Sequence, residues 1–161
     1  MSTLRKKPWN RVDQPVYSIS SVHNGEVNMN ICSYVTPVSM KPKRYIVAIY
    51  KNTKTLELTK QNPQFLLQIL AENQYNLINL LGKKSGFHIN KIDKIKEPVE
   101  FYNDTFAYLS QSLAYIHLRV LNWLDTGDHW CTLCDVVAHK NLNPGKPLSL
   151  ELLKKKKIIR S

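Results

Sequence analysis

Hydrophobic and polar residues alternate along several short stretches of this 161-residue chain, which is the pattern of half-buried β-strands. Residues Val16–Val22 alternate in this way and lead to Asn24-Gly25, a dipeptide that favours a type I′ hairpin turn. A second strand is therefore expected over Val27–Thr36, with alternate side chains facing the core. A proline-containing loop then leads to a third, apolar strand at Tyr45–Tyr50.

The remainder of the chain predicts further short strands and a few short helices. The expected elements are a helix at Thr53–Gln61, a strand at Phe65–Leu70, a helix at Asn76–Leu81, strands at Tyr115–Leu124 and Trp130–Val137, and a helix at Ser149–Lys157. Residues 83–96 are expected to form a loop with one helical turn near Asn90–Lys94. The pattern predicts a mostly β domain. Periodicity alone does not distinguish a barrel from a sandwich, although a barrel leaves no edge strands.

Length and hydropathy indicate one domain over residues 1–161, with a basic tail at 141–161. The longest uninterrupted apolar run is Tyr45–Tyr50, far short of the ~18 residues that a membrane span needs. Residues 1–7 are polar and basic and do not resemble a secretion signal. We therefore expect a soluble, cytoplasmic protein with no membrane partner.

The formal net charge of +11 indicates an anionic partner. The two dense basic runs, Arg5–Lys7 and Lys154–Lys157, lie near the chain ends, where such runs are usually solvated. The chain has none of the common nucleic-acid-binding signatures. Nucleic acid is therefore not favoured, and anionic small molecules such as nucleotides are the other candidate partners.

Three cysteines do not make a disulfide framework, and Cys131-Thr132-Leu133-Cys134 does not make a metal site. Residues three apart on a regular strand point to opposite faces, so the two sulfurs cannot both reach one metal ion. A structural zinc site also needs four ligands, and no second C-x-x-C exists. Buried strand cysteines and no metal are expected.

Hydroxyl, amide and lysine side chains gather in the loops on either side of the third strand. Asn28 and Ser33 lie on the second strand and Ser39 lies in the loop that follows it, whereas the stretch KNTKT at 51–55 follows the third strand. Such donors hold oxyanions. The chain has no G-x-G-x-x-G and no G-x-x-x-x-G-K-[ST] phosphate loop. The loops favour a phosphate-bearing ligand, although the same side chains could simply satisfy strand and helix ends.

The order of these residues resembles the flavin reductase-like family, the FMN-binding split β-barrels. The family's N…S…TP-S…P…K…T pattern is matched by Asn28, Ser33, Thr36-Pro37, Ser39, Pro42, Lys51 and Thr55. Further matches are Pro15-Val16, then Ser85-Gly86 with Asp93-Lys94 for S-G-x-x-x-D-K, and Gly127-Asp128-His129 for G-D-H. The chain departs from the family at Cys134-Asp135-Val136, where Gly-Glu-Val is usual, and at Lys41-Pro42, where two prolines are usual. The likeness covers residues 12–140 and implies a mostly β, FMN-binding split barrel with a few short peripheral helices.

The resemblance also implies a site. The isoalloxazine ring would meet Asn30, Ile31, Cys32 and Ser33 on the second strand. The ribityl phosphate would be held by Ser39, Lys51, Asn52, Thr53 and Thr55, where a helix beginning at Thr53 would direct N–H groups at the anion. His129 would meet the nicotinamide or substrate, although a histidine at a hairpin end is otherwise commonly just exposed.

The expected function is an FMN-binding NAD(P)H:flavin oxidoreductase that acts as a homodimer, with a partner oxygenase as one recipient of the reduced flavin. The flavin itself carries the hydride chemistry, so no protein nucleophile is required. One alternative is an FMN-binding electron-transfer protein similar to flavoredoxin. The other is a non-catalytic barrel that binds FMN, haem or another cofactor.

Overall fold

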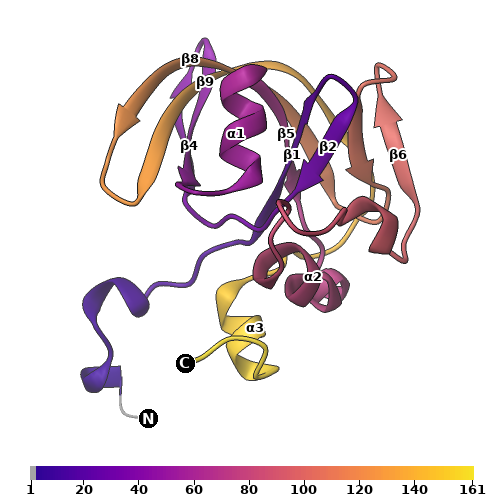
Figure 1. Cartoon of the computed structure of the whole chain (residues 1–161). Coiled ribbons are helices and arrows are strands. Elements are labelled where there is room, and N and C mark those ends of the chain that lie inside the picture. Colours follow the sequence, from indigo (N-terminus) through magenta and orange to yellow (C-terminus); the bar gives the residue numbers. More distant parts are fainter. Residues whose placement is uncertain (1–2) are drawn as a thin grey trace.

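The computed structural model describes residues 3–161 and consists mainly of antiparallel strands (Figure 1). The strands are β1 Tyr17–His23, β2 Glu26–Met29, β3 Val35–Met40, β4 Lys43–Tyr50, β5 Gln64–Ile69, β6 Val99–Tyr102, β7 Phe106–Leu109, β8 Ala114–Asp125 and β9 His129–Asn141. The α-helices are α1 Lys54–Gln61, α2 Ile78–Lys83 and α3 Leu150–Lys155, and the 3-10 helices are η1 Thr3–Arg5, η2 Pro8–Asn10, η3 Glu72–Leu77 and η4 Ile92–Lys94.

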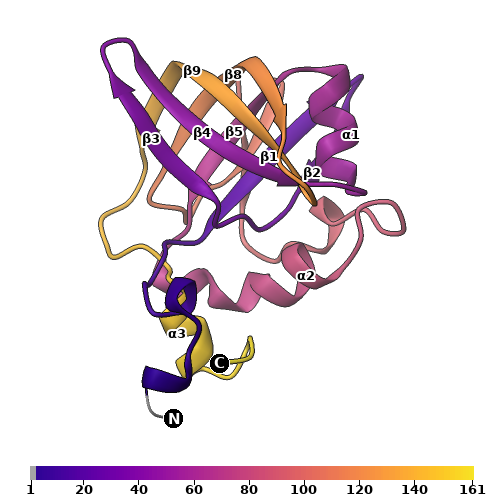
Figure 2. The same cartoon turned by 90° about the vertical axis from the view of Figure 1, so that its left-hand side faces the viewer.

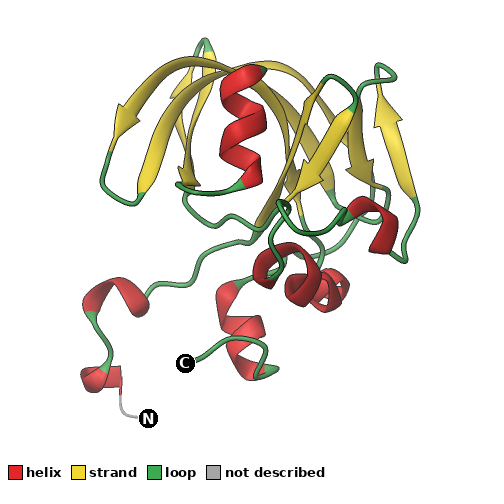
Figure 3. Cartoon of the chain, viewed as in Figure 1, coloured by secondary structure: helices red, strands yellow, loops and turns green. Residues whose placement is uncertain are grey.

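Seven strands form one curled sheet in the order β2-β1-β5-β8-β9-β4-β3 (Figure 2), and β6 and β7 pair as a separate hairpin. Helix α1 contacts β1, β2 and β4 and lies between β4 and the β1–β2 pair, where the barrel is split (Figure 1). The other helices gather at one end of the barrel (Figure 3). The expected fold class, a mostly β split barrel with a few short helices, is confirmed.

Three apolar clusters hold the layers together. The barrel interior is filled from β1, β4, β5 and β8, with Ile19, Val47, Phe65 and Leu118 fully buried. Leu66 points away from the barrel interior and belongs to a second cluster. There it packs with residues of the β6–β7 hairpin and with Tyr115. The third cluster joins the helical end to the barrel. Strand β5 is therefore covered on both faces, as its three consecutive apolar residues at 65–67 require.

The expected second strand over Val27–Thr36 is wrong, because the chain leaves the sheet after Met29. The backbone N–H of Asn30 donates to the Ile19 carbonyl at 3.1 Å, and the Asn30 side-chain Oδ1 accepts from the Ile19 N–H at 2.9 Å. Cys32 then bridges to Tyr17, and the Tyr34 carbonyl accepts from the Ala48 N–H on β4. Residues 30–34 thus cross from β1 to β4, and they are called the crossing segment below.

The prediction of a loop between the second and third strands is also wrong, because Val35–Met40 forms a strand, β3, at the edge of the sheet. Proline is tolerated at Pro37 because an edge strand leaves one row of N–H groups unpaired. The register with β4 shifts between Pro37 and Ser39, which accommodates the missing donor.

The remaining expectations hold with shifted boundaries. The first strand, the Asn24-Gly25 turn with both residues at positive φ, and helix α1 with its Thr53 cap are confirmed. Strands β8 and β9 are longer than expected because the hairpin continues to Ala114 and Asn141. The β6–β7 hairpin was not expected, because Val99–Leu109 has no clean alternation in sequence.

Residues 141–161 are not a solvated tail. Leu148 and Leu153 are fully buried in the cluster at the helical end of the barrel, and the Leu148 N–H donates to the Leu70 carbonyl. The Lys156 ammonium lies 4.0 Å from the centroid of the Tyr75 ring. The lysine-rich sequence concealed this packing, because the apolar side chains between the lysines face the core.

Replacing Leu153 with Ala should lower the free energy of unfolding by about 2–5 kcal/mol, because it leaves a cavity beneath α3. Lys155→Ala, on the same helix but exposed, should change it by less than about 0.5 kcal/mol. Urea unfolding followed by tryptophan fluorescence measures both. Equal effects of the two variants would show that α3 does not contribute to the core.

Candidate functional site

Two adjoining cavities open on either side of the crossing segment. The first, here the α1 cavity, has a volume of about 460 Å³ and lies between the beginning of α1, the end of β2 and residues 81–86. The second, here the aromatic cavity, has a volume of about 320 Å³ and includes Trp9, Tyr34 and Tyr50 in its walls. Asn30, Ile31, Tyr50 and His129 line both cavities, so together they form one continuous site.

Backbone donors of the crossing segment, which lines this site, are left unpaired. The N–H groups of Ile31 and Ser33 make no hydrogen bond with any other described residue. Asn30 uses its Oδ1 atom on Ile19 and leaves its Nδ2 group without an acceptor among residues 3–161. Cys32 differs, since its N–H and carbonyl both pair with Tyr17. The segment therefore offers alternate donors to a polar ligand edge.

The beginning of α1 supplies a second set of donors. Asn52 adopts a positive φ of 59°, and the Thr53 hydroxyl caps the helix by accepting from the Leu56 N–H and donating to the Tyr50 carbonyl. The N–H groups at positions 54 and 55 have no carbonyl partner within the helix. The Asn28 amide donates to the buried Thr55 hydroxyl at 3.0 Å, which joins α1 to β2. This helix end is suited to an anion.

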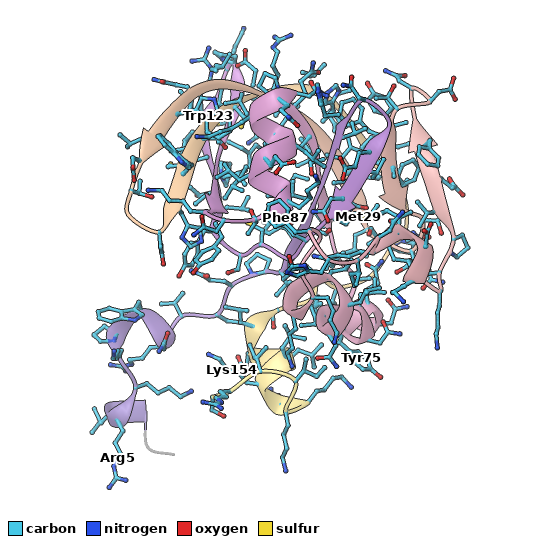
Figure 4. The ribbon with its side chains drawn as sticks, in the orientation of Figure 1. Arg5, Met29, Tyr75, Phe87, Trp123 and Lys154 are labelled. Atoms are coloured by element: carbon cyan, nitrogen blue, oxygen red, sulfur yellow. The ribbon has the colours of Figure 1, made fainter. Side chains whose placement is uncertain are left out.

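Gly86 lies in the wall of the α1 cavity and packs directly against Asn28 and Lys54. A Cβ atom at Gly86 would lie 2.2 Å from the Asn28 Oδ1 atom and 2.9 Å from the Lys54 Cβ atom. A larger residue would therefore displace Asn28 from Thr55. Phe87 also lies beside the beginning of α1, where the Lys54 ammonium is 5.6 Å from the centroid of its ring (Figure 4).

Lys91 is buried beside the α1 cavity, and its residue exposure is 5%. Its ammonium donates to the Leu81 carbonyl at 2.8 Å and to the Met29 carbonyl at 3.1 Å. Burial lowers the pKa of Lys91 to about 8. The side chain thus joins α2 to the end of β2, and it places a buried positive charge next to the cavity.

The electrostatic balance of the α1 cavity is strongly positive. Its walls include Lys54, Lys83, Lys84 and Lys91 and no Asp or Glu. Lys54 is neutralised by Glu26 and Glu57, and the Lys83 ammonium donates to the Ile158 carbonyl. Lys84 and Lys91 make no ion pair with any residue of the described chain. The cavity is therefore built for an anionic ligand.

His129 stands where the two cavities meet. Its Nδ1 atom lies 2.6 Å from Asp128 Oδ1. The centroid of its ring lies 5.0 Å from that of the Tyr34 ring and 5.1 Å from that of the Tyr50 ring. With Asp128 ionised, the Nδ1 atom carries a proton and donates to that carboxylate. The Nε2 atom of the neutral imidazole is then a hydrogen-bond acceptor.

The structure brings together most of the residues expected in the site. Asn30, Ile31, Cys32, Ser33, Asn52, Thr53, Thr55 and His129 all line one or both cavities. Thr53 contributes its backbone, because its hydroxyl is used in the helix cap.

Two expected phosphate ligands lie elsewhere. Ser39 pairs with Arg44 at the far end of the β3–β4 hairpin, so roughly 20 Å of extended strand separates it from the end of β4. The Lys51 ammonium donates to Asp125 at 2.7 Å and lies 5.4 Å from the centroid of the Trp130 ring. Neither side chain lines the α1 cavity.

Lys91 is a site residue that sequence reasoning missed, although the signal was present. The S-G-x-x-x-D-K pattern beginning at Ser85-Gly86 places its last two residues at Asn90-Lys91 when its spacing is kept. The match to Asp93-Lys94 needed three additional residues, and those two residues do not line the α1 cavity. The change from Asp to Asn at position 90 concealed the correct alignment.

The cysteines do not gather into a reactive group. Cys134 is buried inside the barrel and Cys131 is half-buried, and burial raises the pKa of the Cys32 and Cys134 thiols to about 11. Among residues 3–161, no three His, Cys, Asp or Glu side chains lie close enough together to hold a metal ion.

Comparison with known sequences agrees with this architecture. Residues 9–154 match the family described as the flavin reductase like domain. Because the match covers most of the chain, the protein belongs to the flavin reductase-like family.

Solved structures of similar fold include several flavin proteins. The FMN-binding protein from Thermus thermophilus has a TM-score of 0.77 and 20% identity, and the alignment covers 91% of this chain and 86% of that one. The styrene monooxygenase flavin reductase from Pseudomonas putida S12 has a TM-score of 0.72 and 19% identity, with 85% of each chain covered. Flavoredoxin from Methanosarcina acetivorans has a TM-score of 0.74 and 18% identity, and the alignment covers 91% of this chain and 79% of that one.

Curated relatives are much longer than this chain. A protein of Nostoc sp. strain PCC 7120 that carries the name diflavin flavoprotein A 3 is 25% identical over 134 residues, which are 82% of this chain and 23% of the relative. The chain thus spans about a quarter of the length of the curated relatives it matches. Within the described part of the chain, no helix has the length and apolar character needed to cross a membrane.

The buried Lys91 should make stability depend on pH in the ligand-free protein. Below pH 8 the folded and unfolded states both carry the proton, so the cost of burying the charge is fully present. Between about pH 8 and 10.5 the unfolded state keeps a proton that the folded state has lost, so stability rises with pH. Relative to Lys91→Met, the wild-type free energy of unfolding should increase by roughly 3 kcal/mol across this range. Urea titrations of both proteins at several pH values measure the difference, and parallel curves would contradict the prediction.

Proposed function

We propose that this protein binds FMN across the two cavities and reduces it with NAD(P)H. The observation that carries the proposal is the pairing of an acid-free, lysine-lined cavity at a helix N-terminus with an adjoining aromatic cavity edged by backbone donors. The first matches a phosphate, and the second matches a planar ring with carbonyl groups at one edge. The family to which the chain belongs and the flavin proteins of similar fold support the same ligand.

The residues present fit such a cofactor. The N–H groups of Ile31 and Ser33 would donate to the carbonyl oxygens of the isoalloxazine edge, and the amide of Asn30 adds a further donor. Thr55 and the first N–H groups of α1 would hold the phosphate. Bound FMN would supply the hydride acceptor, its N5 atom, so the protein needs no nucleophile of its own.

His129 would position the nicotinamide against the flavin. Its Nε2 atom would accept a hydrogen bond from the carboxamide N–H₂ group, while Asp128 and the two tyrosine rings fix the imidazole. Trp9 and Lys154 line the same aromatic cavity and would limit the entry of water. The protein thus contributes orientation and distance, which determine the rate of hydride transfer.

Two other functions use the same site. An electron carrier similar to flavoredoxin would bind FMN but leave no room for nicotinamide, and the Trp9 and Lys154 side chains at the aromatic cavity favour this reading if they stay in place. A non-catalytic barrel would bind FMN, haem or another cofactor without reducing it. The absorbance spectrum of the purified protein separates flavin from haem.

Replacing His129 with Ala should lower kcat/KM for NADH or NADPH about tenfold to a hundredfold, because one hydrogen bond worth about 1–3 kcal/mol is lost. FMN affinity should stay nearly unchanged. Anaerobic stopped-flow bleaching of the flavin absorbance measures the rate with each nicotinamide in turn. His139→Ala, an exposed histidine at the other end of β9, is the matched control.

The outcomes separate the candidate functions. A wild-type protein that binds FMN but is bleached by neither nicotinamide would leave the electron carrier as the function. Equal bleaching of wild type and His129→Ala would remove His129 from the reaction while the reductase function stands.

The protein also fits a homodimer. Tyr34 on the crossing segment and Leu124 on the β8–β9 hairpin are both more than half exposed, and Trp123 and Trp130 pack edge to face on that same hairpin. A second subunit would cover these groups and the rim of the aromatic cavity. An oxygenase that takes up reduced flavin is the partner class proposed for the product, as the styrene monooxygenase reductase of similar fold suggests.

Light scattering at micromolar concentration should give about twice the 18.7 kDa mass of one chain. Changing Leu124 to Glu should shift the mass toward one chain, because a charge buried in an interface is costly. Lys140→Glu, an exposed change near the other end of β9, serves as the control. A wild-type mass of one chain would rule out the dimer.

A further inference from the structure

The two dense basic runs, which lie near opposite ends of the sequence, meet at one end of the molecule. The N-terminal segment runs beside α3, where the Glu151 N–H donates to Asp13 Oδ1 at 2.9 Å. Both termini lie at the same end of the barrel (Figures 1 and 2), and the Arg5 side chain points away from the barrel at this end (Figure 4). Residues 3–13 and 149–161 therefore form one surface, which is called the basic face below.

Most of the net charge of the chain lies on the basic face. Its two segments carry nine Lys and Arg residues against Asp13 and Glu151, a net charge of +7 out of +11 for the whole chain. Lys155 pairs with Glu151 at 3.2 Å, and the other eight cations form no ion pair with any residue of 3–161. Leu153 is buried in the core, so the lysines of α3 project from an anchored helix. Such a concentration of unpaired charge attracts an anionic partner.

Exposed apolar side chains lie among the charges of the N-terminal segment. Leu4, Trp9 and Val12 are all more than two-thirds exposed, and the Lys7 ammonium lies 5.7 Å from the centroid of the Trp9 ring. Protein interfaces combine an apolar centre with a polar rim and are enriched in Trp and Arg. Nucleic acid would use the cations and stack a base on Trp9, but it has little use for the aliphatic Leu4 and Val12. The basic face therefore suits an acidic protein better than a nucleic acid.

A second copy of this chain is the wrong occupant for the basic face. A two-fold dimer interface places the same patch of both subunits opposite each other. Two faces that each carry a charge of +7 would repel, since like charges across an interface oppose association. The dimer proposed above uses another surface, at the β8–β9 hairpin and the crossing segment. The occupant of the basic face is therefore a different protein with an acidic surface.

The basic face also borders the candidate site. Trp9 and Lys154 belong to the face and line the aromatic cavity, in which the isoalloxazine ring is proposed to bind. A protein seated on the face would therefore lie against one wall of this cavity. That position suits the recipient of the reduced flavin.

We propose that the basic face is the docking surface for an acidic protein that receives the reduced flavin from this chain. The purpose of docking rests on the proposed flavin function, whereas the surface itself does not. Docking covers Trp9 and places carboxylates of the partner against the surrounding cations, with apolar side chains of the partner against Leu4 and Val12. The flavin passes as an intact molecule, so docking adds no chemical step.

The first test uses a fluorescein-labelled peptide of repeated Glu-Glu-Leu-Phe units as the acidic partner and follows its anisotropy during titration with the whole chain. The peptide should bind at least about tenfold more tightly than a matched Lys-Lys-Leu-Phe peptide. Binding should be lost between about 0.1 and 1 M salt, because the Debye length falls from about 10 to 3 Å. A DNA duplex of equal charge and vesicles that contain anionic lipid should both bind more weakly than the acidic peptide.

Charge reversal locates the docking surface. Changing all three residues of Arg5–Lys7 to Glu should weaken the acidic peptide about tenfold to a hundredfold, because like charges then face each other. The control changes Lys41, Lys43 and Lys140 to Glu, three exposed lysines near the β3–β4 turn at the other end of the barrel (Figure 2). The control alters the net charge equally and should weaken the peptide less than about threefold.

Trp9 reports directly on docking. Changing Trp123 and Trp130 to Phe leaves it as the only tryptophan of the chain. The acidic peptide should then shift the Trp9 emission to shorter wavelength and protect it from quenching by acrylamide. Trp9→Ala should weaken the peptide about fivefold or more. If the double Phe variant does not fold, Trp9→Ala and the charge-reversed variants still test the surface.

The link between the basic face and the flavin has its own readout. A saturating concentration of the acidic peptide should slow the exchange of bound FMN with flavin in solution, because docking covers one wall of the aromatic cavity. An unchanged rate of exchange would overturn the role of the partner as recipient.

The remaining outcomes separate the surface from the flavin function. Absence of peptide binding at low salt, equal weakening by the two charge-reversed variants, or tighter binding of DNA or vesicles would overturn the docking surface and leave the flavin function standing. Peptide binding that depends on Arg5–Lys7, in a protein that binds no flavin, would support the surface and overturn the flavin function.

Discussion

The hydrogen bonds that carry the crossing segment from β1 to β4 are the constraint on which the rest of this structure depends. Asn30 and Cys32 pair with β1, and Tyr34 pairs with β4, so β2 and β3 come to lie at opposite edges of the sheet. The gap between β4 and the β1–β2 pair is filled by α1. Both cavities lie along the crossing segment. The split in the barrel and the candidate site therefore have the same origin.

The two sides of the site differ in how their charges are satisfied. At the His129 end the imidazole has its carboxylate, Asp128, and two tyrosine rings, so its orientation is fixed without a ligand. At the Lys91 end the charge is buried without a carboxylate. Such an arrangement costs stability. The candidate site thus has one end whose charge is paired within the chain and one end whose charge is not.

The termini of the described chain also belong to this architecture. Trp9 from the N-terminal segment and Lys154 from α3 line the aromatic cavity, while Leu148 and Leu153 anchor α3 in the core. In the proposed complex, these side chains would decide whether nicotinamide can enter beside the flavin ring. They would therefore decide between a reductase and an electron carrier.

The sequence by itself determined the class of fold and the chemical nature of the site. Local signals sufficed for the Asn24-Gly25 turn, for the Thr53 helix cap and for the donors of residues 28–55, because turns, caps and polar loops depend on near neighbours. Only the tertiary structure decided which of two lysines lines the α1 cavity. Lys51 and Lys91 look alike in sequence, yet Asp125, 74 residues away in the chain, holds the first, and burial between β2 and α2 places the second at the cavity. The second strand ends at Met29 because the Asn30 side-chain Oδ1 atom, in place of the Asn30 main-chain carbonyl, accepts the hydrogen bond of the Ile19 N–H on β1.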